Sequence, residues 1–262
     1  MKLSKKLTLT VTIGLLLVLP MLAAVGNASS ATITPLADVL DGTARDVYVD
    51  GTTAYVSAGA GGLKIYDVST LTAPVLIGES GDIGYVESVF ISGNYAIVAA
   101  GEEGLVTLDI SDLSNPTFVD SYRNHGTDEH TTEVIVDSGI AYFADGEDGF
   151  ETVSVTPAGS IFPRDDYDTI GTAYTALELI GTDIFAIGRN GMKVFDVTNP
   201  YEITPTANYD DGGWCNDIEI VGEFAYLADF EEGLEIVNIT IPTTTNMSEV
   251  GQYDVRPIIF QA

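Results

Sequence analysis

The sequence is poor in cysteine, in basic residues and in long apolar runs, and each shortage narrows what the protein can be. Cys215 is the only cysteine among 262 residues, so no disulfide can form within the chain. Ten lysines and arginines stand against 39 aspartates and glutamates, which gives a formal net charge of −29. A surface of this sign repels phosphate backbones and anionic lipids, which argues against nucleic-acid binding and peripheral membrane attachment. Cations, basic partners and plain solubility remain open.

The one long apolar run lies at the N-terminus. Residues 7–25 are apolar, Lys2, Lys5 and Lys6 precede them, and small residues follow at 26–31. This order predicts a secretory signal peptide at residues 1–30, followed by an exported domain at 31–262. An uncleaved N-terminal anchor is the alternative, because the run is near the lower limit for a membrane span. We therefore expect a secreted or cell-surface protein that contacts the membrane through no other segment.

A unit with two turn residues at fixed spacing recurs five times along the chain. The first turn positions are 42, 45, 43 and 41 residues apart and are occupied by Gly51, Gly93, Ser138, Gly181 and Gly222. A glycine follows each of them after 11 residues, or 10 in the fourth copy, at Gly62, Gly104, Gly149, Gly191 and Gly233. Copies at this regularity indicate a repeat architecture.

Each copy reads as four short strands, which the first copy illustrates. Residues 46–49 alternate in polarity and end at a tight turn, and residues 54–57 are apolar on both faces. A glycine-bearing loop leads to the alternating segment 63–68, and a loop with proline leads to 75–78. No window with a helical period and caps competes. The sequence therefore predicts an all-β β-propeller of four-stranded blades, with about five repeats of about 42 residues.

The third-strand segments resemble the LVIVD repeat, and they read LKIYDVS, LVTLDIS, MKVFDVT and LEIVNIT. The resemblance covers most of the predicted domain and implies an exported surface β-propeller of a bacterium or archaeon. The third copy departs from the pattern, with Ser154 at the position of Asp67, Asp109 and Asp196, and the fifth copy has Asn238 there. A role common to all blades, the capping of the following turn, suits these side chains better than catalysis.

The sequence does not decide how the blades close into a ring. Residues 33–42 resemble a lone fourth strand, and residues 255–262 resemble the beginning of another first strand. The pattern favours five blades, with part of a larger ring as the alternative. An open edge would invite pairing with a second chain, so closure bears on the oligomeric state.

One face of such a propeller collects the loops between strands two and three and the connections between blades. The residues that lead into the inner strands differ from copy to copy and combine aromatic with charged groups, which is typical of a ligand or partner site. The predicted binding residues at this mouth of the channel are Arg45, Tyr85, Glu87, His130, Glu133, Tyr174, Trp214 and Asn216. The alternative is that they fill the channel with mutual polar contacts. Trp214 is the strongest candidate, because an exposed indole is costly unless it packs on something.

Calcium is the one cofactor that the sequence suggests. The loop DGEDG offers carboxylates and backbone carbonyls, the ligands that calcium takes. The candidate metal ligands are Asp145, Glu147 and Asp148. The loop lacks the spacing of an EF-hand, and a solvated acidic rim is the alternative.

Motifs of common enzyme classes are missing, including the nucleophile elbow, the HExxH zinc motif and the P-loop. Cys215 and His130 both open inner strands, which allows a thiol–imidazole contact, although a buried structural thiol is favoured. We predict a binding or scaffolding module that engages an extracellular protein or glycan, with calcium as a candidate aid. The alternative is an extracellular hydrolase or lyase with its site at the channel mouth.

Overall fold

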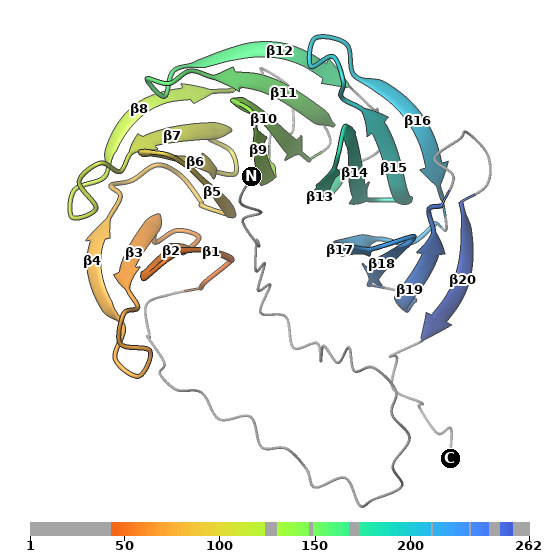
Figure 1. The fold of residues 1–262 in the computed structure, drawn as a ribbon, viewed down its shortest axis with the longest axis horizontal. Helices are drawn as coiled ribbons and strands as arrows, with labels where there is room; N and C mark the ends of the chain where they lie inside the picture. Colours follow the sequence, from red (N-terminus) through yellow and green to blue (C-terminus); the bar gives the residue numbers. More distant parts are fainter. Residues whose placement is uncertain are drawn as a thin grey trace, which may run out of the picture.

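The computed structural model describes residues 43–123, 130–146, 149–167, 173–210, 212–230, 232–240 and 247–253. These residues form 20 strands in five four-stranded antiparallel sheets. The sheets stand as blades around a central axis (Figure 1), which confirms the predicted fold class and repeat count. A membrane-spanning helix is not found in the described part of the chain.

Every blade runs from its inner strand to its outer strand in chain order. Blade 1 consists of β1 (Asp46–Asp50), β2 (Thr53–Ser57), β3 (Leu63–Asp67) and β4 (Val75–Glu79). Blade 2 consists of β5 (Ser88–Ser92), β6 (Tyr95–Ala99), β7 (Leu105–Asp109) and β8 (Thr117–Tyr122). Blade 3 consists of β9 (Thr131–Asp137), β10 (Ile140–Asp145), β11 (Phe150–Val155) and β12 (Ile161–Tyr167). Blade 4 consists of β13 (Tyr174–Ile180), β14 (Asp183–Gly188), β15 (Gly191–Asp196) and β16 (Thr204–Tyr209). Blade 5 consists of β17 (Cys215–Val221), β18 (Phe224–Asp229), β19 (Gly233–Asn238) and β20 (Ser248–Tyr253).

The recurring turn residues all have a positive φ. The first turn positions have φ of 59°, 60°, 50°, 65° and 64° at Gly51, Gly93, Ser138, Gly181 and Gly222. The second positions have φ of 75°, 72°, 103°, 91° and 93° at Gly62, Gly104, Gly149, Gly191 and Gly233. Glycine enters this left-handed region without the steric cost of a Cβ atom, which explains why the repeat spacing is marked by glycine.

The buried apolar side chains form four clusters, and each cluster fills the interface between two neighbouring blades. Strand β6 shows how: Ala96 and Val98 point toward blade 1, while Ile97 and Ala99 point toward blade 3. The second strand of each blade is therefore apolar on both faces because both faces are covered, as the sequence predicted. A blade buries its faces only by packing on its neighbours.

Polar side chains add hydrogen bonds across these interfaces. Thr107 Oγ1 on β7 donates to Gly159 O of blade 3 at 2.7 Å, and Thr152 Oγ1 on β11 donates to Pro200 O of blade 4 at 2.9 Å. Asp120 Oδ2 on β8 accepts from Ile161 N of blade 3 at 2.9 Å. Since buried hydrogen bonds are directional, these contacts fix the angle at which one blade meets the next.

In four of the five blades the side chain at the end of the third strand caps the turn that follows, as predicted. Asp67, Asp109 and Asp196 each accept a hydrogen bond at 2.8 Å from the backbone N two residues later. Asn238 makes the same 2.8 Å bond in blade 5. In blade 3 this role passes to Thr156, whose Oγ1 accepts from Ser160 N at 3.0 Å.

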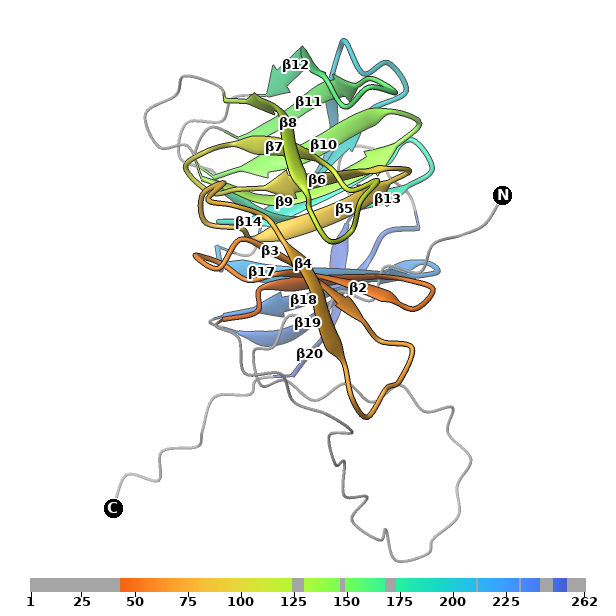
Figure 2. The ribbon, with the colours of Figure 1, turned by 90° about the vertical axis from the view of Figure 1, so that its left-hand side faces the viewer.

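The described residues do not close the ring. Strand β1 packs on β5, β5 on β9, β9 on β13 and β13 on β17, but β17 and β1 make no contact of this extent. Figure 1 shows the resulting arc, with an opening between blades 1 and 5, and Figure 2 shows β4 and β8 at the outer edge of the first two blades. Leu234 of blade 5 is 39% exposed, whereas Met192 at the same position of blade 4 is 1% exposed. Leu234 is thus an apolar side chain on blade 5 that the described residues leave partly uncovered.

Two glycine substitutions test how the turn positions are constrained. We expect Gly93→Ala to lower the free energy of unfolding by about 1–2 kcal/mol, the cost of a left-handed conformation. We expect Gly104→Ala to cost about 3 kcal/mol or more, because an added Cβ would also lie 2.3 Å from Tyr122 O. A Cβ at Gly93 would meet nothing within 4 Å, so that variant is the matched control. Urea unfolding of both variants measures the difference, and equal losses would contradict the steric argument.

Candidate functional site

The turns between the second and third strands and the residues that lead into the inner strands lie on one side of the arc, which we call the loop face. Isolated β-bridges join the two kinds of segment across neighbouring blades: Gly59–Val86, Gly101–Thr131, Gly146–Tyr174 and Arg189–Trp214. The bridges confirm the predicted sorting of the loops. Neighbouring blades therefore contribute to one continuous surface.

Three predicted binding residues form a charged group on the loop face, which we call the Glu87 cluster. Arg45, Glu87 and His130 come from the segments that lead into β1, β5 and β9. Arg45 Nε lies 2.6 Å from Glu87 Oε2, and His130 Nε2 lies 3.5 Å from Glu87 Oε1. The side chain of Glu87 is 9% exposed, whereas those of Arg45 and His130 are 44% and 50% exposed. One shielded carboxylate thus holds two nitrogen groups at the surface, each from a different blade.

The members of the Glu87 cluster shift one another's protonation. Burial alone would raise the pKa of Glu87, but the hydrogen bonds and charges of His130 and Arg45 outweigh it and hold this pKa below its usual value. The hydrogen bond to Glu87 raises the pKa of His130 against the opposing effect of burial. The same carboxylate raises the pKa of Arg45. Glu87 is therefore ionised at neutral pH, and His130 keeps its proton to a higher pH than an isolated histidine.

Two predicted aromatic residues are exposed on the loop face, and each lies beside an arginine. Tyr85 is 40% exposed, and Arg45 Cζ lies 5.9 Å from its ring centroid. Trp214 is also 40% exposed, and Arg189 Cζ lies 6.0 Å from its ring. Both distances allow a cation–π interaction. The sequence reasoning missed Arg189, although GRNG is the only turn at this position of the repeat with a basic residue.

The other three predicted binding residues have different surroundings. Glu133 on β9 is half-buried, and its Oε1 lies 3.5 Å from Ser88 Oγ on blade 2. Tyr174 is 1% exposed and packs edge-on against Phe195 with 5.9 Å between ring centroids, so its ring belongs to the core between blades 3 and 4. Asn216 is exposed near the start of β17. The structure therefore gathers Arg45, Tyr85, Glu87 and His130, and it places the remaining candidates separately.

Of the three calcium candidates, the described residues include Asp145 alone. Asp145 is buried, and its Oδ1 accepts a hydrogen bond from Thr131 Oγ1 at 2.6 Å. Glu147 and Asp148 lie outside the described residues. In the part of the chain that the structure describes, no three His, Cys, Asp or Glu side chains are grouped so as to hold a metal ion. Calcium binding by this loop stays a prediction.

The thiol of Cys215 lies in the core, as the sequence favoured. The residue is buried in the apolar cluster between blades 4 and 5. Its Sγ lies 3.8 Å from Asp229 Oδ2 of the neighbouring strand. This position suits a structural thiol better than a nucleophile paired with His130.

The fold and the loop face define the protein as a multi-bladed β-propeller. The LVIVD repeat family matches residues 41–80, 83–124 and 212–255, which contain blades 1, 2 and 5. The chain is therefore a β-propeller that contains LVIVD repeats, as the third-strand segments predicted. The family match leaves out blades 3 and 4. The third strand of blade 3 departs from the repeat pattern at Ser154, whereas that of blade 4 reads MKVFDVT and keeps it.

Similarity to solved structures extends over most of the chain at very low identity. Sqt1 of Saccharomyces cerevisiae is 8% identical with a TM-score of 0.63, over 82% of this chain and 62% of that one. The WD40 β-propeller domain of Doa1 is 8% identical with a TM-score of 0.61, over 83% and 70%. The computationally designed Ika8 protein is 11% identical with a TM-score of 0.59, over 79% and 60%. The chain thus spans about three fifths of Sqt1 and Ika8, and these similarities show the fold alone. No curated protein sequence matches the chain.

The Glu87 cluster makes a prediction for the titration of His130. Because Glu87 raises the pKa of His130, this pair stabilises the fold fully below the pKa of an unfolded histidine, and the contribution is lost as the pH rises through the folded pKa. We expect NMR titration to give His130 a pKa above its ordinary value. Glu87→Gln should lower that pKa, whereas Glu133→Gln, which removes a carboxylate outside the cluster, should leave it nearly unchanged. An unaltered His130 titration in Glu87→Gln would contradict the pairing.

Proposed function

We propose that the protein is an exported binding module that engages an extracellular protein or glycan through its loop face. The observation that carries this proposal is the combination of exposed aromatic rings and arginines there. Tyr85 and Trp214 are each 40% exposed and each lies within 6.0 Å of a guanidinium group. Tyrosine, tryptophan and arginine are the side chains that contribute most to binding energy at protein interfaces.

The Glu87 cluster supports binding more than acid–base chemistry. A hydrolase of the glycosidase type needs one carboxyl group that is protonated at working pH, which requires a raised pKa. The pKa of Glu87 is lowered instead, and each of its two oxygens faces a nitrogen group of another blade. A carboxylate in this state fixes the positions of Arg45 and His130, which remain exposed to a partner.

The export part of the proposal rests on the N-terminal sequence. The basic residues, the apolar run and the small residues in the first 31 positions have the order of a secretory signal. An exported location also agrees with the acidic composition, because a negatively charged surface repels nucleic acids and anionic phospholipids.

The aromatic residues should dominate the affinity for the partner. We expect Trp214→Ala to weaken binding about tenfold or more, and Tyr85→Ala to weaken it by a similar factor, as for residues at the centre of an interface. Phe162→Ala on the outer strand β12 removes a ring that is 53% exposed, and it should leave the affinity unchanged. A glycan array and a panel of extracellular proteins identify the ligand, and titration of each variant against it gives the three affinities. Equal losses in all three variants would refute a site on the loop face.

The same ligand separates binding from the hydrolase or lyase alternative. Glu87→Gln and His130→Ala should weaken binding, and mass spectrometry of the incubated ligand should show no product with the natural chain. Product formation that disappears in Glu87→Gln, while binding is kept, would establish the enzyme instead.

Calcium assistance is tested by thermal unfolding. If the DGEDG loop binds calcium, an ion at about 100 times its dissociation constant adds about 2.7 kcal/mol, which raises Tm by several degrees relative to excess EDTA. The same concentration of magnesium is the control for ionic strength. Asp148→Asn should remove a calcium-specific rise, and equal Tm values in calcium, magnesium and EDTA would remove calcium from the proposal.

A further inference from the structure

A tyrosine ends the fourth strand of every blade except the first. Each of these tyrosines pairs with a residue at the start of the preceding strand in its blade. The first residue of that strand pairs with Tyr122 and with Tyr167, and the second residue pairs with Tyr209 and with Tyr253. Ser80 holds this position in blade 1, where its backbone N donates to Leu63 O at 2.8 Å. The first blade therefore lacks the ring that the other four blades carry.

These tyrosine rings fill the interface with the following blade. Tyr167 of blade 3 lies 4.9 Å from the Phe195 ring of blade 4, and Lys193 Nζ lies 5.4 Å from the Tyr167 ring. Tyr122 of blade 2 lies 6.0 Å from the Phe143 ring of blade 3. Burial, together with the charge of Glu151 and a hydrogen bond to it, raises the pKa of Tyr122.

The exposure of the last tyrosine shows what these rings require. Tyr253 on blade 5 has no described blade after it and is 69% exposed, whereas Tyr122, Tyr167 and Tyr209 are half-buried. Each interface that contains the tyrosine thus receives its ring, and the interface between blades 1 and 2 receives none.

A cavity occupies the corresponding place between blades 1 and 2, and we call it the blade 1–2 notch. Its volume is about 330 Å³, and one of its lining residues is Val106 on β7. Val106 stands at the position of Glu151 and Lys193, the residues of the following blades that contact Tyr122 and Tyr167. Ser80 does not line the notch: its short side chain turns back to accept from Leu63 N at 2.9 Å, so no ring extends from this position toward Val106.

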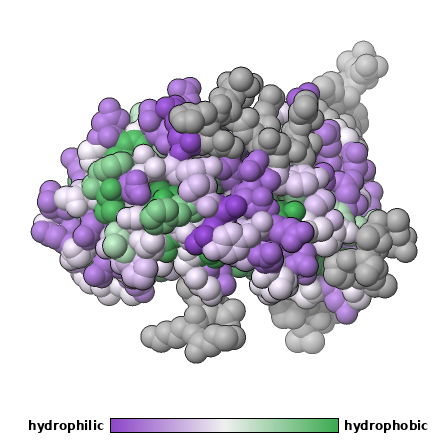
Figure 3. All heavy atoms as spheres, turned by 90° about the horizontal axis from the view of Figure 1, so that it is seen from above, coloured by the Kyte–Doolittle hydropathy of each residue, from purple (hydrophilic) through white to green (hydrophobic). Residues whose placement is uncertain are grey.

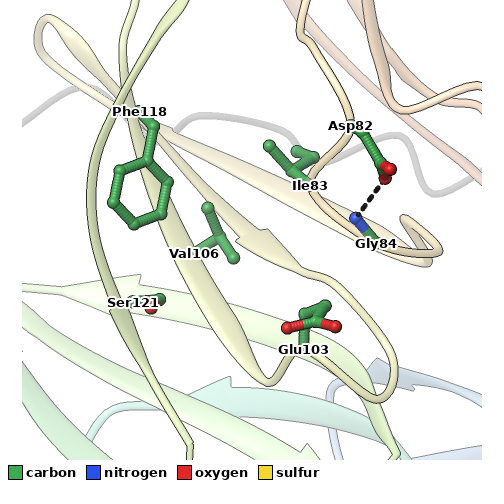
Figure 4. Close-up of a pocket in the computed structure, with 7 residues that line it drawn as sticks. All are labelled: Asp82, Ile83, Gly84, Glu103, Val106, Phe118 and Ser121. Atoms are coloured by element: carbon green, nitrogen blue, oxygen red, sulfur yellow. Dashed lines mark hydrogen bonds between the residues drawn. The ribbon is translucent and has the colours of Figure 1, made fainter.

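The lining of the notch combines an apolar wall with an acidic edge. Phe118 and Val106 lie on the left in Figure 4, Asp82 lies on the right, and Ile83 and Glu103 lie between them, above and below. Phe118 is 60% exposed. Figure 3 shows a group of hydrophobic residues on one side of a rim that is otherwise mostly hydrophilic. Glu103 Oε2 lies 3.9 Å from Arg123 Nη1 at the surface, and Asp82 Oδ1 accepts from Gly84 N at 3.4 Å.

We infer that the blade 1–2 notch is a binding pocket for a tyrosine side chain of a partner polypeptide, one that carries basic residues beside the tyrosine. The three internal tyrosines show that this place in the repeat accepts a phenol ring, and the pair of Tyr122 with Glu151 shows a carboxylate accepting its hydroxyl. Glu103 and Asp82 offer carboxylates for the hydroxyl and for flanking lysines, in a chain of net charge −29. This site is separate from the Glu87 cluster and does not depend on the proposed function.

The test uses two peptides and the methyl groups of the notch. Capped Lys-Lys-Tyr-Lys-Lys and Lys-Lys-Ala-Lys-Lys are titrated into the full chain, and the methyl resonances of Ile83 and Val106 are followed by NMR. We expect the tyrosine peptide to shift both resonances with a dissociation constant of about 1 mM, the affinity of one ring with a few charges. The alanine peptide should bind at least about threefold more weakly.

Variants of the notch and of the loop face complete the test. Ser80→Tyr installs the missing ring, so it should abolish the shifts and raise Tm, and Phe118→Ala should weaken the peptide about threefold at unchanged Tm. Trp214→Ala should have no effect, which separates the notch from the part of the loop face around Trp214, between blades 4 and 5. Equal shifts with both peptides, or no shift at the notch, would overturn the inference. Shifts of Ile83 and Val106 on simple dilution would also overturn it and identify a second copy of the chain as the occupant.

Discussion

The packing of one four-stranded sheet on the next is the interaction on which everything else in this protein depends. No blade has a core of its own, because its second strand is apolar on both faces and one sheet cannot cover either face by itself. Phe185, Met192 and Val194 of blade 4 reach full burial only against the residues of blade 5. Each such side chain contributes about 1.5–3 kcal/mol when removed from water, so the interfaces rather than the sheets hold most of the stability.

This arrangement also explains where charged residues of different blades come together. The interior of each interface is mostly apolar, so a group of charged and partly exposed residues from successive blades forms at its end. The loop face is one of these ends, and there Arg45, Glu87 and His130 arrive from three successive blades at a spacing that the interfaces set. Hydrogen bonds such as those of Thr107 and Thr152 make that spacing a property of the fold rather than of the loops. A partner would therefore meet a surface whose cationic groups are already in position.

The sequence predicts the parts of the structure that follow from local rules. The turn positions at Gly51 and Gly62 need a positive φ, and the capping role of Asp67 needs only its own turn, so both are readable from one repeat. The strand limits of blade 1 agree with the predicted ones within one residue. What the sequence does not reveal depends on neighbours in space. The burial of Tyr174 against Phe195 is an example, because strand alternation alone does not say which side chain at a strand start turns inward.

The notch between blades 1 and 2 can be predicted from the sequence only in part. The aligned repeats contain its signal, since Ser80 stands where the other copies have tyrosine. A missing ring becomes a cavity only when the neighbouring blade cannot move in to fill it. That condition belongs to packing: Gly78, two residues before Ser80, already approaches Leu113 O so closely that an added Cβ would lie 1.9 Å from it. The blades are in contact at this point and can close no further.

The open arc has a mechanical consequence. In a closed ring, a small rotation at one interface must be compensated at the others, which makes the central channel stiff. Between residues 43 and 253, no described contact of comparable extent ties blade 5 back to blade 1, so rotations at the four interfaces add together. Within these residues each blade-to-blade spacing is set by one interface, whereas the distance from blade 1 to blade 5 is set by all four. A rotation at the interface between blades 3 and 4 would therefore change the distance from Arg45 to Trp214, but it would leave the pairing of Arg45 with Glu87 unchanged.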